Sequence, residues 1–363
     1  MIAGRKDDHV RHAHEQQRRP AGDNRFDDVR FVHHALAGLD RSEVSLATRF
    51  GGIAWEVPLY INAMTGGSVR TGMINRDLAI AARETGVPIA TGSMSAYFAD
   101  ASTADTFRVM RKENPGGFIM ANVNANATVE NARRAVGLLE ADALQIHLNA
   151  VQETVMPEGD RDFSAWAATI EKIVKGVGVP VIVKEVGFGL SRETLLRLRT
   201  LGVRLADVSG SGGTDFARIE NDRRDRADYS FLLGWGQSTP ACLLDAQDAG
   251  LPVLASGGVR HPLDVVRALA LGAVAAGASG LFLKTVLDAG VPGLVSLISA
   301  WLDQVAALMT VLGARTPADL TRCDVLIQGS LSAFCARRGI DTDRLATRSR
   351  SFTSTVEGET SDD

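Results

Sequence analysis

The side chains best suited to chemistry in this 363-residue chain lie in the segment QIHLNAVQE, residues 145–153. His147, Asn149, Gln152 and Glu153 fall within seven positions, directly after a run of apolar residues. Imidazole, amide and carboxylate groups crowded into one short loop are costly to bury unless something binds them. They could cap the next helix or satisfy one another, but we favour contacts to a substrate and a metal ion.

A lysine, Lys184, ends a second apolar run, VIVK, and is followed by Glu185. The apolar run should bury the stem of the lysine. A charge held in this place could stand beside an electron-rich cofactor ring. Glu185 is a candidate ion-pair partner for Lys184.

Three glycine-rich segments follow later apolar runs: SGSGGT at 209–214, SGG at 256–258 and GASG at 277–280. Glycine lets backbone N–H groups approach a phosphate closely. Any one of these segments could be an ordinary turn. Three of them after successive predicted strands favour a phosphate site.

Basic side chains cluster near the N-terminus, at Arg5, Lys6, His9, Arg11 and His12. The net charge of −4 gives no general attraction to nucleic acid or to an anionic membrane. An anionic ligand therefore needs a local cluster of this kind. The cluster is either a solvated charged arm or the partner of a diphosphate.

The elements that must position these groups form a (β/α)8 TIM barrel in our interpretation. From about residue 57, short apolar runs rich in β-formers alternate with amphipathic stretches of helical period, which indicates a parallel sheet. The expected strands lie near 58–63, 88–91, 118–121, 143–147, 181–184, 206–209, 252–256 and 273–276. The polar and glycine segments follow these strands, at the end of the barrel where active sites of this fold lie.

The two ends of the chain are expected to lie outside the barrel. Residues 1–56 are interpreted as an irregular N-terminal arm that caps the barrel, and 346–363 as a polar, acidic, disordered tail. The barrel would span 57–345 and include closing helices at 287–312 and 316–335.

Composition limits the compartment and the redox chemistry. The charged N-terminus lacks the apolar core of a signal peptide, and no stretch has the roughly 18 to 20 continuous apolar residues of a membrane span. We therefore expect a cytoplasmic protein. Cys242, Cys323 and Cys335 are widely spaced and contain no CxxC pair, so we expect buried, unreactive thiols.

Taken together, these segments resemble the type 2, FMN-dependent isopentenyl diphosphate isomerases over nearly the whole chain. The resemblance runs from RKDDHV at 5–10 through INAMTGG, ATGSMSA, HLNAVQE and DVSGSGGTDFARIE to GASGLFL near the end. The histidine-containing HLNxxQE pattern and the early RKxxH are specific to that family. The glycine motifs are shared with other FMN barrels.

The resemblance implies a flavin site and a substrate site. The flavin would be bound by Thr65, Gly66, Gly67, Ser93, Asn122, Lys184, Ser209, Thr214, Gly257, Gly258, Val259, Arg260, Ser279 and Gly280. The substrate would be bound by Arg5, Lys6, His9, Ser93, Met94, Ser95, His147, Asn149 and Gln152, with His147 and Gln152 in catalytic roles and Glu153 as the Mg²⁺ ligand. The SMS segment at 93–95 departs from the SQR of many members, and ANVNA from the more usual ANLGA.

The activity implied is the interconversion of isopentenyl and dimethylallyl diphosphate in isoprenoid biosynthesis. It requires protonating an alkene carbon and removing an allylic proton without net oxidation. A reduced flavin, primed by NADPH, would carry this chemistry. The resemblance also implies a homo-oligomer, a tetramer or octamer, acting on a small prenyl diphosphate.

Other functions remain open on the sequence. An FMN-dependent 2-hydroxy-acid oxidoreductase would need a histidine base that SGSGGTDFARIE lacks, and a purine-nucleotide dehydrogenase would need a cysteine there. A flavin-binding barrel without catalysis would not need His147, Gln152 or Glu153.

Overall fold

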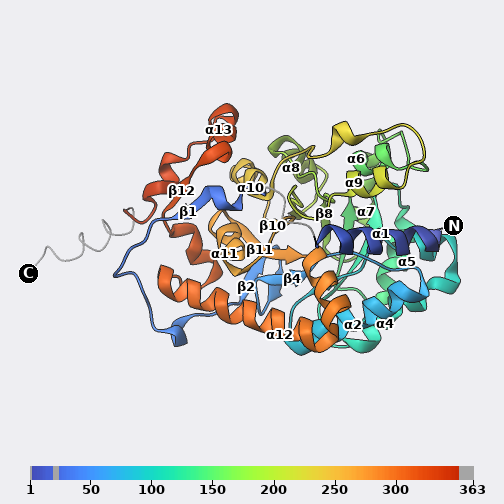
Figure 1. Ribbon diagram of the computed structural model, residues 1–363, viewed down its shortest axis with the longest axis horizontal. Helices are drawn as coiled ribbons and strands as arrows, with labels where there is room; N and C mark the ends of the chain where they lie inside the picture. The colour runs from blue at the N-terminus through green and yellow to red at the C-terminus, as the bar shows by residue number, and fades with distance from the viewer. Residues whose placement is uncertain (1, 19–23, 351–363) are drawn as a thin grey trace, which may run out of the picture.

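The computed structural model describes residues 2–18 and 24–350. Its centre is a closed barrel of eight parallel strands in the order β10-β11-β4-β5-β6-β7-β8-β9 (Figure 1). The strands are β4 (Leu59–Ile61), β5 (Ile89–Ala90), β6 (Ile119–Asn124), β7 (Ala143–His147), β8 (Val181–Lys184), β9 (Leu205–Asp207), β10 (Val253–Ser256) and β11 (Ala273–Ala278). The predicted (β/α)8 barrel and its eight strands are confirmed.

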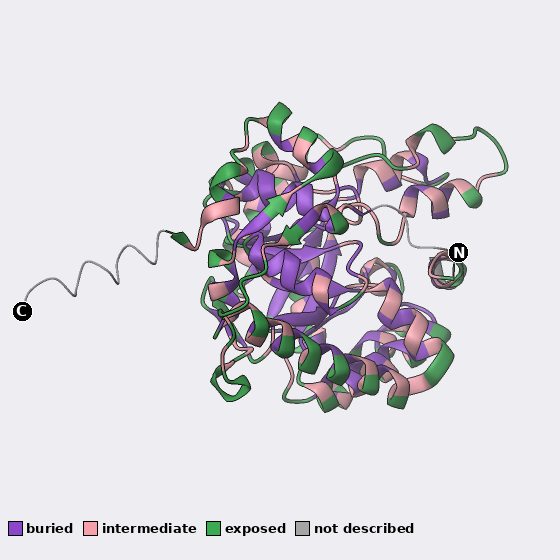
Figure 2. Ribbon diagram, turned by 60° about the vertical axis from the view of Figure 1, so that its left-hand side comes forward, coloured by how far each residue is buried: buried purple, intermediate pink, exposed green. Residues whose placement is uncertain are grey.

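Helices cover the outside of the barrel, so most strand residues are buried on both faces (Figure 2). This double burial explains why the strands appear in the sequence as continuous apolar runs. The covering helices are α2 (Val69–Thr85), α4 (Asp105–Glu113), α5 (Val129–Leu139), α7 (Trp166–Gly176), α8 (Arg192–Thr200), α10 (Thr239–Ala246), α11 (Pro262–Ala270) and α12 (Gly280–Leu312). Shorter helices, α3 (Ser95–Ala99), α6 (Ala150–Val155) and α9 (Phe216–Asp222), follow β5, β7 and β9.

Aromatic side chains close the end of the barrel where the strands begin. The hairpin of β2 (Thr48–Phe50) and β3 (Ile53–Trp55) brings the indole of Trp55 within 5.5 Å of the rings of both Tyr60 and Phe118. Inward-facing apolar side chains such as Leu254 pack in the same cluster. The opposite end, where the strands finish, is left for polar groups.

The N-terminal arm contains a regular helix, α1 (Ile2–Gln16), so the prediction of an irregular arm is wrong for these residues. Val10 and Ala13, one turn apart, are buried in the main core cluster. This apolar contact with distant parts of the chain stabilises a helix whose own sequence is strongly polar.

The predicted helix over 316–335 is also wrong. This stretch contains the 3-10 helix η5 (Pro317–Arg322), the strand β12 (Val325–Ile327) and the start of α13 (Gly329–Arg338). β12 pairs antiparallel with β1 (Val29–Phe31), from the other end of the chain. An apolar run that pairs with so distant a partner carries no local signal of that pairing.

Helix α12 is long and apolar enough to cross a membrane, by length and composition. Its backbone is interrupted at Gly290, whose φ of 66° and ψ of −171° are not helical. Phe282, Ile298 and Trp301 on this helix are buried in the main core cluster. The helix therefore serves as a packing element of the barrel in this structure.

The start of the predicted disordered tail is packed. The 3-10 helix η6 (Asp343–Thr347) buries Leu345, and the Ser349 hydroxyl donates to Asp324 at 2.6 Å. The remainder of the predicted tail, 351–363, lies outside the described residues. Cys242, Cys323 and Cys335 are free thiols, and burial raises the pKa of each above its ordinary value.

Candidate active site

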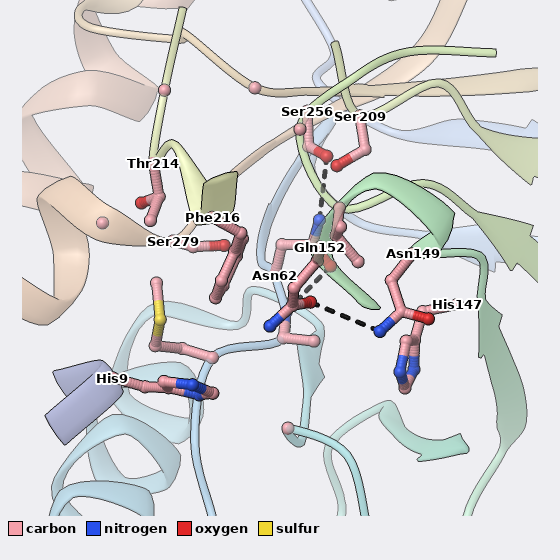
Figure 3. Close-up of a pocket in the computed structure, with 18 of the residues that line it drawn as sticks. His9, Asn62, His147, Asn149, Gln152, Ser209, Thr214, Phe216, Ser256 and Ser279 are labelled. Atoms are coloured by element: carbon pink, nitrogen blue, oxygen red, sulfur yellow. Dashed lines mark hydrogen bonds between the residues drawn. The ribbon is translucent and has the colours of Figure 1, made fainter. Parts of the chain in front are cut away.

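A cavity of about 510 Å³ opens where the barrel strands end. Figure 3 shows that its walls carry side chains from separate loops, with His147 and Asn149 on one side and Thr214 and Ser279 on another. It brings together most residues predicted for the site: Arg5, Lys6, His9, Ser93, Ser95, Asn122, His147, Asn149, Gln152, Glu153, Lys184, Ser209, Thr214, Gly257, Gly258, Val259, Arg260, Ser279 and Gly280.

Strand register sets the polar residues at one level of the barrel. Asn124 is paired with His147, His147 with Lys184, and Lys184 with Asp207, across β6, β7, β8 and β9. All four residues are therefore strand neighbours at the mouth of the barrel. This explains how single polar residues far apart in the sequence meet around one cavity.

The loop after β7 continues into α6, which carries the amide and carboxylate groups. The Asn149 amide donates to one Glu153 carboxylate oxygen at 2.8 Å, and the backbone N–H of Asp160 donates to the other at 2.9 Å. Each carboxylate oxygen keeps lone-pair capacity beyond these bonds. Glu153 is thus held at the cavity wall with two carboxylate oxygens that could serve as metal ligands.

Helix α1 lies over the mouth and contributes Arg5, Lys6 and His9 to the cavity. Its C-terminal end is attached to the loop before α9 by two hydrogen bonds, since the Gln16 amide donates to the Asp215 carbonyl at 3.0 Å and accepts from the Asp215 N–H at 2.9 Å. Near its other end, the Ser68 hydroxyl donates to Asp7 at 2.6 Å. These contacts fix the basic residues above the cavity.

The carboxylate that faces this helix, Glu220 of α9, was missed by the sequence prediction. It lies 2.9 Å from His9 Nε2 and accepts from the Gln152 amide at 2.8 Å. Burial would raise the pKa of Glu220, but the bonds from His9 and Gln152 and the charge of Arg223 lower it to about 2. A buried, ionised carboxylate therefore joins the arm to the loop after β7.

Lys6 is buried beside these groups. Burial, and then the neighbouring Arg5 charge, lower its pKa to about 8, against the raising effect of Glu220 and Glu153. Its ammonium group is therefore close to losing its proton just above neutral pH.

We predict that kcat/KM for an anionic substrate falls as the pH rises through about 8. Protonated Lys6 attracts the anion. Below the pKa of Lys6 the free enzyme carries this charge, and above that pKa it loses the charge. A Lys6→Arg variant keeps the charge at these pH values, so the same alkaline fall should disappear from its profile. If kcat/KM of Lys6→Arg falls at the same pH as that of the wild type, a group other than Lys6 is titrating.

Lys184 and Glu185 do not form the ion pair that was considered. The Lys184 ammonium donates to the backbone carbonyl of Glu185 at 2.5 Å, while the Glu185 carboxylate accepts from the N–H groups of Val186, Gly187 and Phe188. Burial lowers the pKa of Lys184 and raises that of Glu185 to about 7. The carboxylate shapes the loop, and the lysine faces the cavity.

The glycine loops leave a cradle beside Thr214. A Cβ on Gly257 would lie 2.0 Å from the Gly210 carbonyl, and Gly257 has a φ of +92°, so a side chain there is excluded. The buried Thr214 hydroxyl has no hydrogen-bond partner among the described residues, and the long helix α12 begins next to it at Gly280. Backbone N–H groups, an unpartnered hydroxyl and a helix N-terminus together suit a phosphate group such as that of FMN.

Four predicted residues do not line the cavity. Met94 is fully buried in the main core cluster, because the turn at the start of α3 directs it inward. Thr65, Gly66 and Gly67 lie where the chain leaves β4 for α2, and a Cβ on Gly66 would be 2.1 Å from the Phe107 ring. Close packing against Phe107 explains this glycine.

Arg260 lines the cavity, but its guanidinium group is engaged elsewhere. It pairs with Asp27 at 2.9 Å and with Asp264 at 2.8 Å. Its contribution to a phosphate site would therefore come from the backbone of its loop.

Several lining residues were missed by the sequence prediction, among them Gln16, Gln17, Asn62, Ala63, Met64, Asn124 and Phe216. Asn62, Ala63 and Met64 directly precede the predicted Thr65 in the motif INAMTGG, so this motif reaches the cavity through the residues just before those predicted. Phe216 and Glu220 share the helix α9, whose sequence alone does not show which of its faces meets the cavity.

Comparisons with known proteins are consistent with this geometry. Residues 99–326 match the family model of the FMN-dependent dehydrogenases. The chain is 72% identical over 349 residues to an isopentenyl-diphosphate delta-isomerase of Kitasatospora griseola, with 96% of each chain covered. It is 70% identical over 350 residues to the enzyme of that name from Streptomyces sp. (strain CL190), again with 96% of each covered.

Solved structures share the fold at low sequence identity. A putative lactate oxidase of Pediococcus acidilactici superimposes with a TM-score of 0.66 at 16% identity, covering 90% of this chain and 94% of that one. A flavocytochrome b2 mutant with pyruvate bound gives 0.65 at 20% identity, covering 90% and 84%. These likenesses support the barrel architecture.

Proposed function

This chain belongs to the type 2, FMN-dependent isopentenyl-diphosphate delta-isomerases, and on that premise we propose how its cavity interconverts isopentenyl and dimethylallyl diphosphate. The observation that carries the proposal is that one cavity is lined both by glycine loops beside the unpartnered Thr214 hydroxyl and, separately, by the basic residues of α1. The glycine cradle at Thr214 suits the flavin phosphate, and the basic residues of α1 suit a diphosphate.

Reduced FMN, when bound, supplies the acid–base chemistry that moves the double bond without net oxidation. The residues around it bind, orient and shield. Lys184 places a buried positive charge at the cavity wall, where it would stabilise an electron-rich ring. Asn122, Ser209, Ser279 and the glycine loops would hold the rest of the cofactor.

The substrate would lie between α1 and the loop after β7. Arg5, Lys6 and His9 would bind the diphosphate with charge-assisted hydrogen bonds. Gln152, held by Glu220, and His147 would orient the carbon chain, with Asn149, Ser93 and Ser95 completing the wall. Because α1 covers the mouth, it would also exclude water from the reacting carbons.

Glu153 would hold Mg²⁺ against the diphosphate. Mg²⁺ typically takes one or two carboxylates and completes its shell with phosphate oxygens and waters. A single carboxylate on the cavity wall fits this donor set. We propose further that NADPH reduces the flavin, and that the enzyme is cytoplasmic and forms a homo-oligomer, a tetramer or octamer.

The same cavity disfavours the alternative reactions. Of the described lining residues, only His9 and His147 are histidines, and neither lies on the loops after β9 or β10 where a 2-hydroxy-acid oxidoreductase needs its base. A flavin-binding barrel without catalysis would have no use for basic groups on α1 opposite a buried Glu220.

An anaerobic assay with FMN, NADPH, Mg²⁺ and isopentenyl diphosphate tests the proposal. Prior reduction of the flavin should switch on formation of dimethylallyl diphosphate, and many product molecules should form per NADPH consumed. One NADPH oxidised per product would indicate a reductase. A protein that binds flavin but forms no product would indicate a binding protein.

A further inference from the structure

A row of buried polar side chains crosses the barrel at the wall of the cavity, which three of its five members line. It runs through His147, Asn122, Gln145, Asn62 and Asp207, each at most 9% exposed. The contacts are His147 Nδ1 to Asn122 Oδ1 at 2.7 Å, Asn122 Nδ2 to Gln145 Oε1 at 3.0 Å, Gln145 Nε2 to Asn62 Oδ1 at 3.2 Å, and Asn62 Nδ2 to Asp207 Oδ2 at 2.9 Å. The row is continuous from β9 to β7.

At the Asp207 end of the row, three further groups donate hydrogen bonds to the carboxylate. This carboxylate receives the Tyr60 hydroxyl at 2.7 Å, the Ser256 hydroxyl at 2.8 Å and the backbone N–H of Ser209 at 3.1 Å. Burial, and then the Asp207 charge, raise the pKa of Tyr60 well above its ordinary value, so the phenol keeps its proton. With these donors around the carboxylate, Asn62 must present its NH₂ group to Asp207.

An amide side chain donates through nitrogen and accepts through oxygen, so the direction set at Asp207 passes along the row. The Asn62 oxygen is fixed again by the backbone N–H of Ala63 at 2.8 Å. The Asn62 oxygen also accepts a hydrogen bond from the Gln145 NH₂ group, and the Gln145 oxygen accepts one from the Asn122 NH₂ group. The Asn122 oxygen then faces His147 Nδ1, which has to donate.

We propose that Asp207, acting through Asn62, Gln145 and Asn122, is a positioning group that keeps the proton of His147 on Nδ1 and leaves Nε2 with its lone pair. The proposal rests on the proposed function only in assigning His147 to the substrate. The tautomer itself follows from hydrogen-bond direction. The network thus decides which of the two ring nitrogens is protonated.

The tautomer limits what His147 can do. Burial, and then the charges of Lys184 and Lys6, lower the pKa of His147 to about 3, against a smaller raising effect of the Val123 carbonyl. The free enzyme therefore holds a neutral ring. A neutral ring with the proton on Nδ1 accepts hydrogen bonds at Nε2, and it donates to a phosphate oxygen only after taking up a second proton.

Gln145 is the residue at which to cut the row. It is fully buried and does not line the cavity, so replacing it removes no contact to flavin or substrate. Gln145→Met keeps the length of the side chain and removes the hydrogen bonds of its amide to Asn122 and Asn62. Tyr60→Phe is the matched control, because it removes one donor from Asp207 and leaves the row uncut.

Long-range ¹⁵N NMR of the flavin-loaded enzyme, labelled at histidine, reports which ring nitrogen carries the proton. The chain has seven histidines, and a His147→Asn variant identifies the signal. Wild type and Tyr60→Phe should show His147 protonated at Nδ1, whereas Gln145→Met should shift the signal toward a mixture of tautomers. Retained flavin shows that each variant is folded.

Three results would overturn the proposal: protonation at Nε2 in the wild type, an unchanged signal in Gln145→Met, or an equal shift in Tyr60→Phe. The wild-type spectrum decides the tautomer even if Gln145→Met does not fold. None of these readouts depends on turnover, so failure of the isomerase assignment is detected separately by the activity assay.

Discussion

Replacing Glu153 by glutamine should lower turnover by at least about 100-fold at limiting Mg²⁺ while the protein keeps its flavin. The carboxylate is the proposed metal ligand, and a neutral amide oxygen binds Mg²⁺ far more weakly. Substitutions that only support a metal ligand from outside already cost about 10- to 100-fold, so loss of the ligand itself should cost more. Activity measured against Mg²⁺ concentration gives the effect.

Asp160→Asn is the matched control for Glu153→Gln. Asp160 also lines the cavity, but its carboxylate accepts from the Asn126 amide at 2.6 Å instead of from the groups around Glu153. This variant should keep an ordinary Mg²⁺ requirement. If Glu153→Gln needs no more metal than wild type and keeps its rate, Glu153 is not the ligand.

Removing the charge of Lys6 should raise KM for isopentenyl diphosphate about ten-fold or more. A charge-assisted hydrogen bond contributes about 1.5 to 3 kcal/mol, and about 1.4 kcal/mol corresponds to a factor of ten in binding. Lys6→Met keeps the length of the side chain, and flavin retention should be unaffected because the residues proposed to bind the flavin lie on other elements. Steady-state kinetics under reducing conditions measure the change.

Arg11→Met separates this effect from a general loss of positive charge on α1. The Arg11 side chain is 52% exposed and does not line the cavity. The KM of Arg11→Met for isopentenyl diphosphate should stay within about two-fold of wild type, as expected on removal of a solvated charge. Equal KM values for wild type and Lys6→Met would remove Lys6 from the site. Point variants are preferable to deleting residues 1–10, because Val10 is part of the core.

The sequence was sufficient to predict the barrel and the polar residues that lie at the end of each strand. Continuous apolar runs mark the strands because both of their faces are buried, and polar residues stand where each run ends. His147 and Lys184 could be placed in one site before their contacts were known, because the barrel brings all strand ends to one mouth.

The features that the sequence did not predict are those that depend on contacts between distant segments of the chain. Glu220 ends the segment DVSGSGGTDFARIE, but nothing in that segment shows that its carboxylate is buried, because its partners His9 and Arg223 come from α1 and from the end of α9. β12 looks like part of a helix until β1 is placed beside it. Gln145 could be recognised as inward-facing from its spacing to His147, but the partners that give it a direction lie on other strands.

Asn24 and Asp27, which follow α1 in the chain, also hold the glycine loop after β10 in place, and these contacts affect how the protein folds. The Asn24 amide donates to the Gly258 carbonyl at 2.7 Å, a contact between residues 234 positions apart, and Asp27 pairs with Arg260 across 233. Contacts of such long sequence separation form slowly, because a large loop must close first. During synthesis the early residues must wait for nearly the whole barrel, so the glycine cradle is completed late. If FMN binds in this cradle, as proposed, yellow colour reports that residues 24–27 and the loop after β10 have reached their native places.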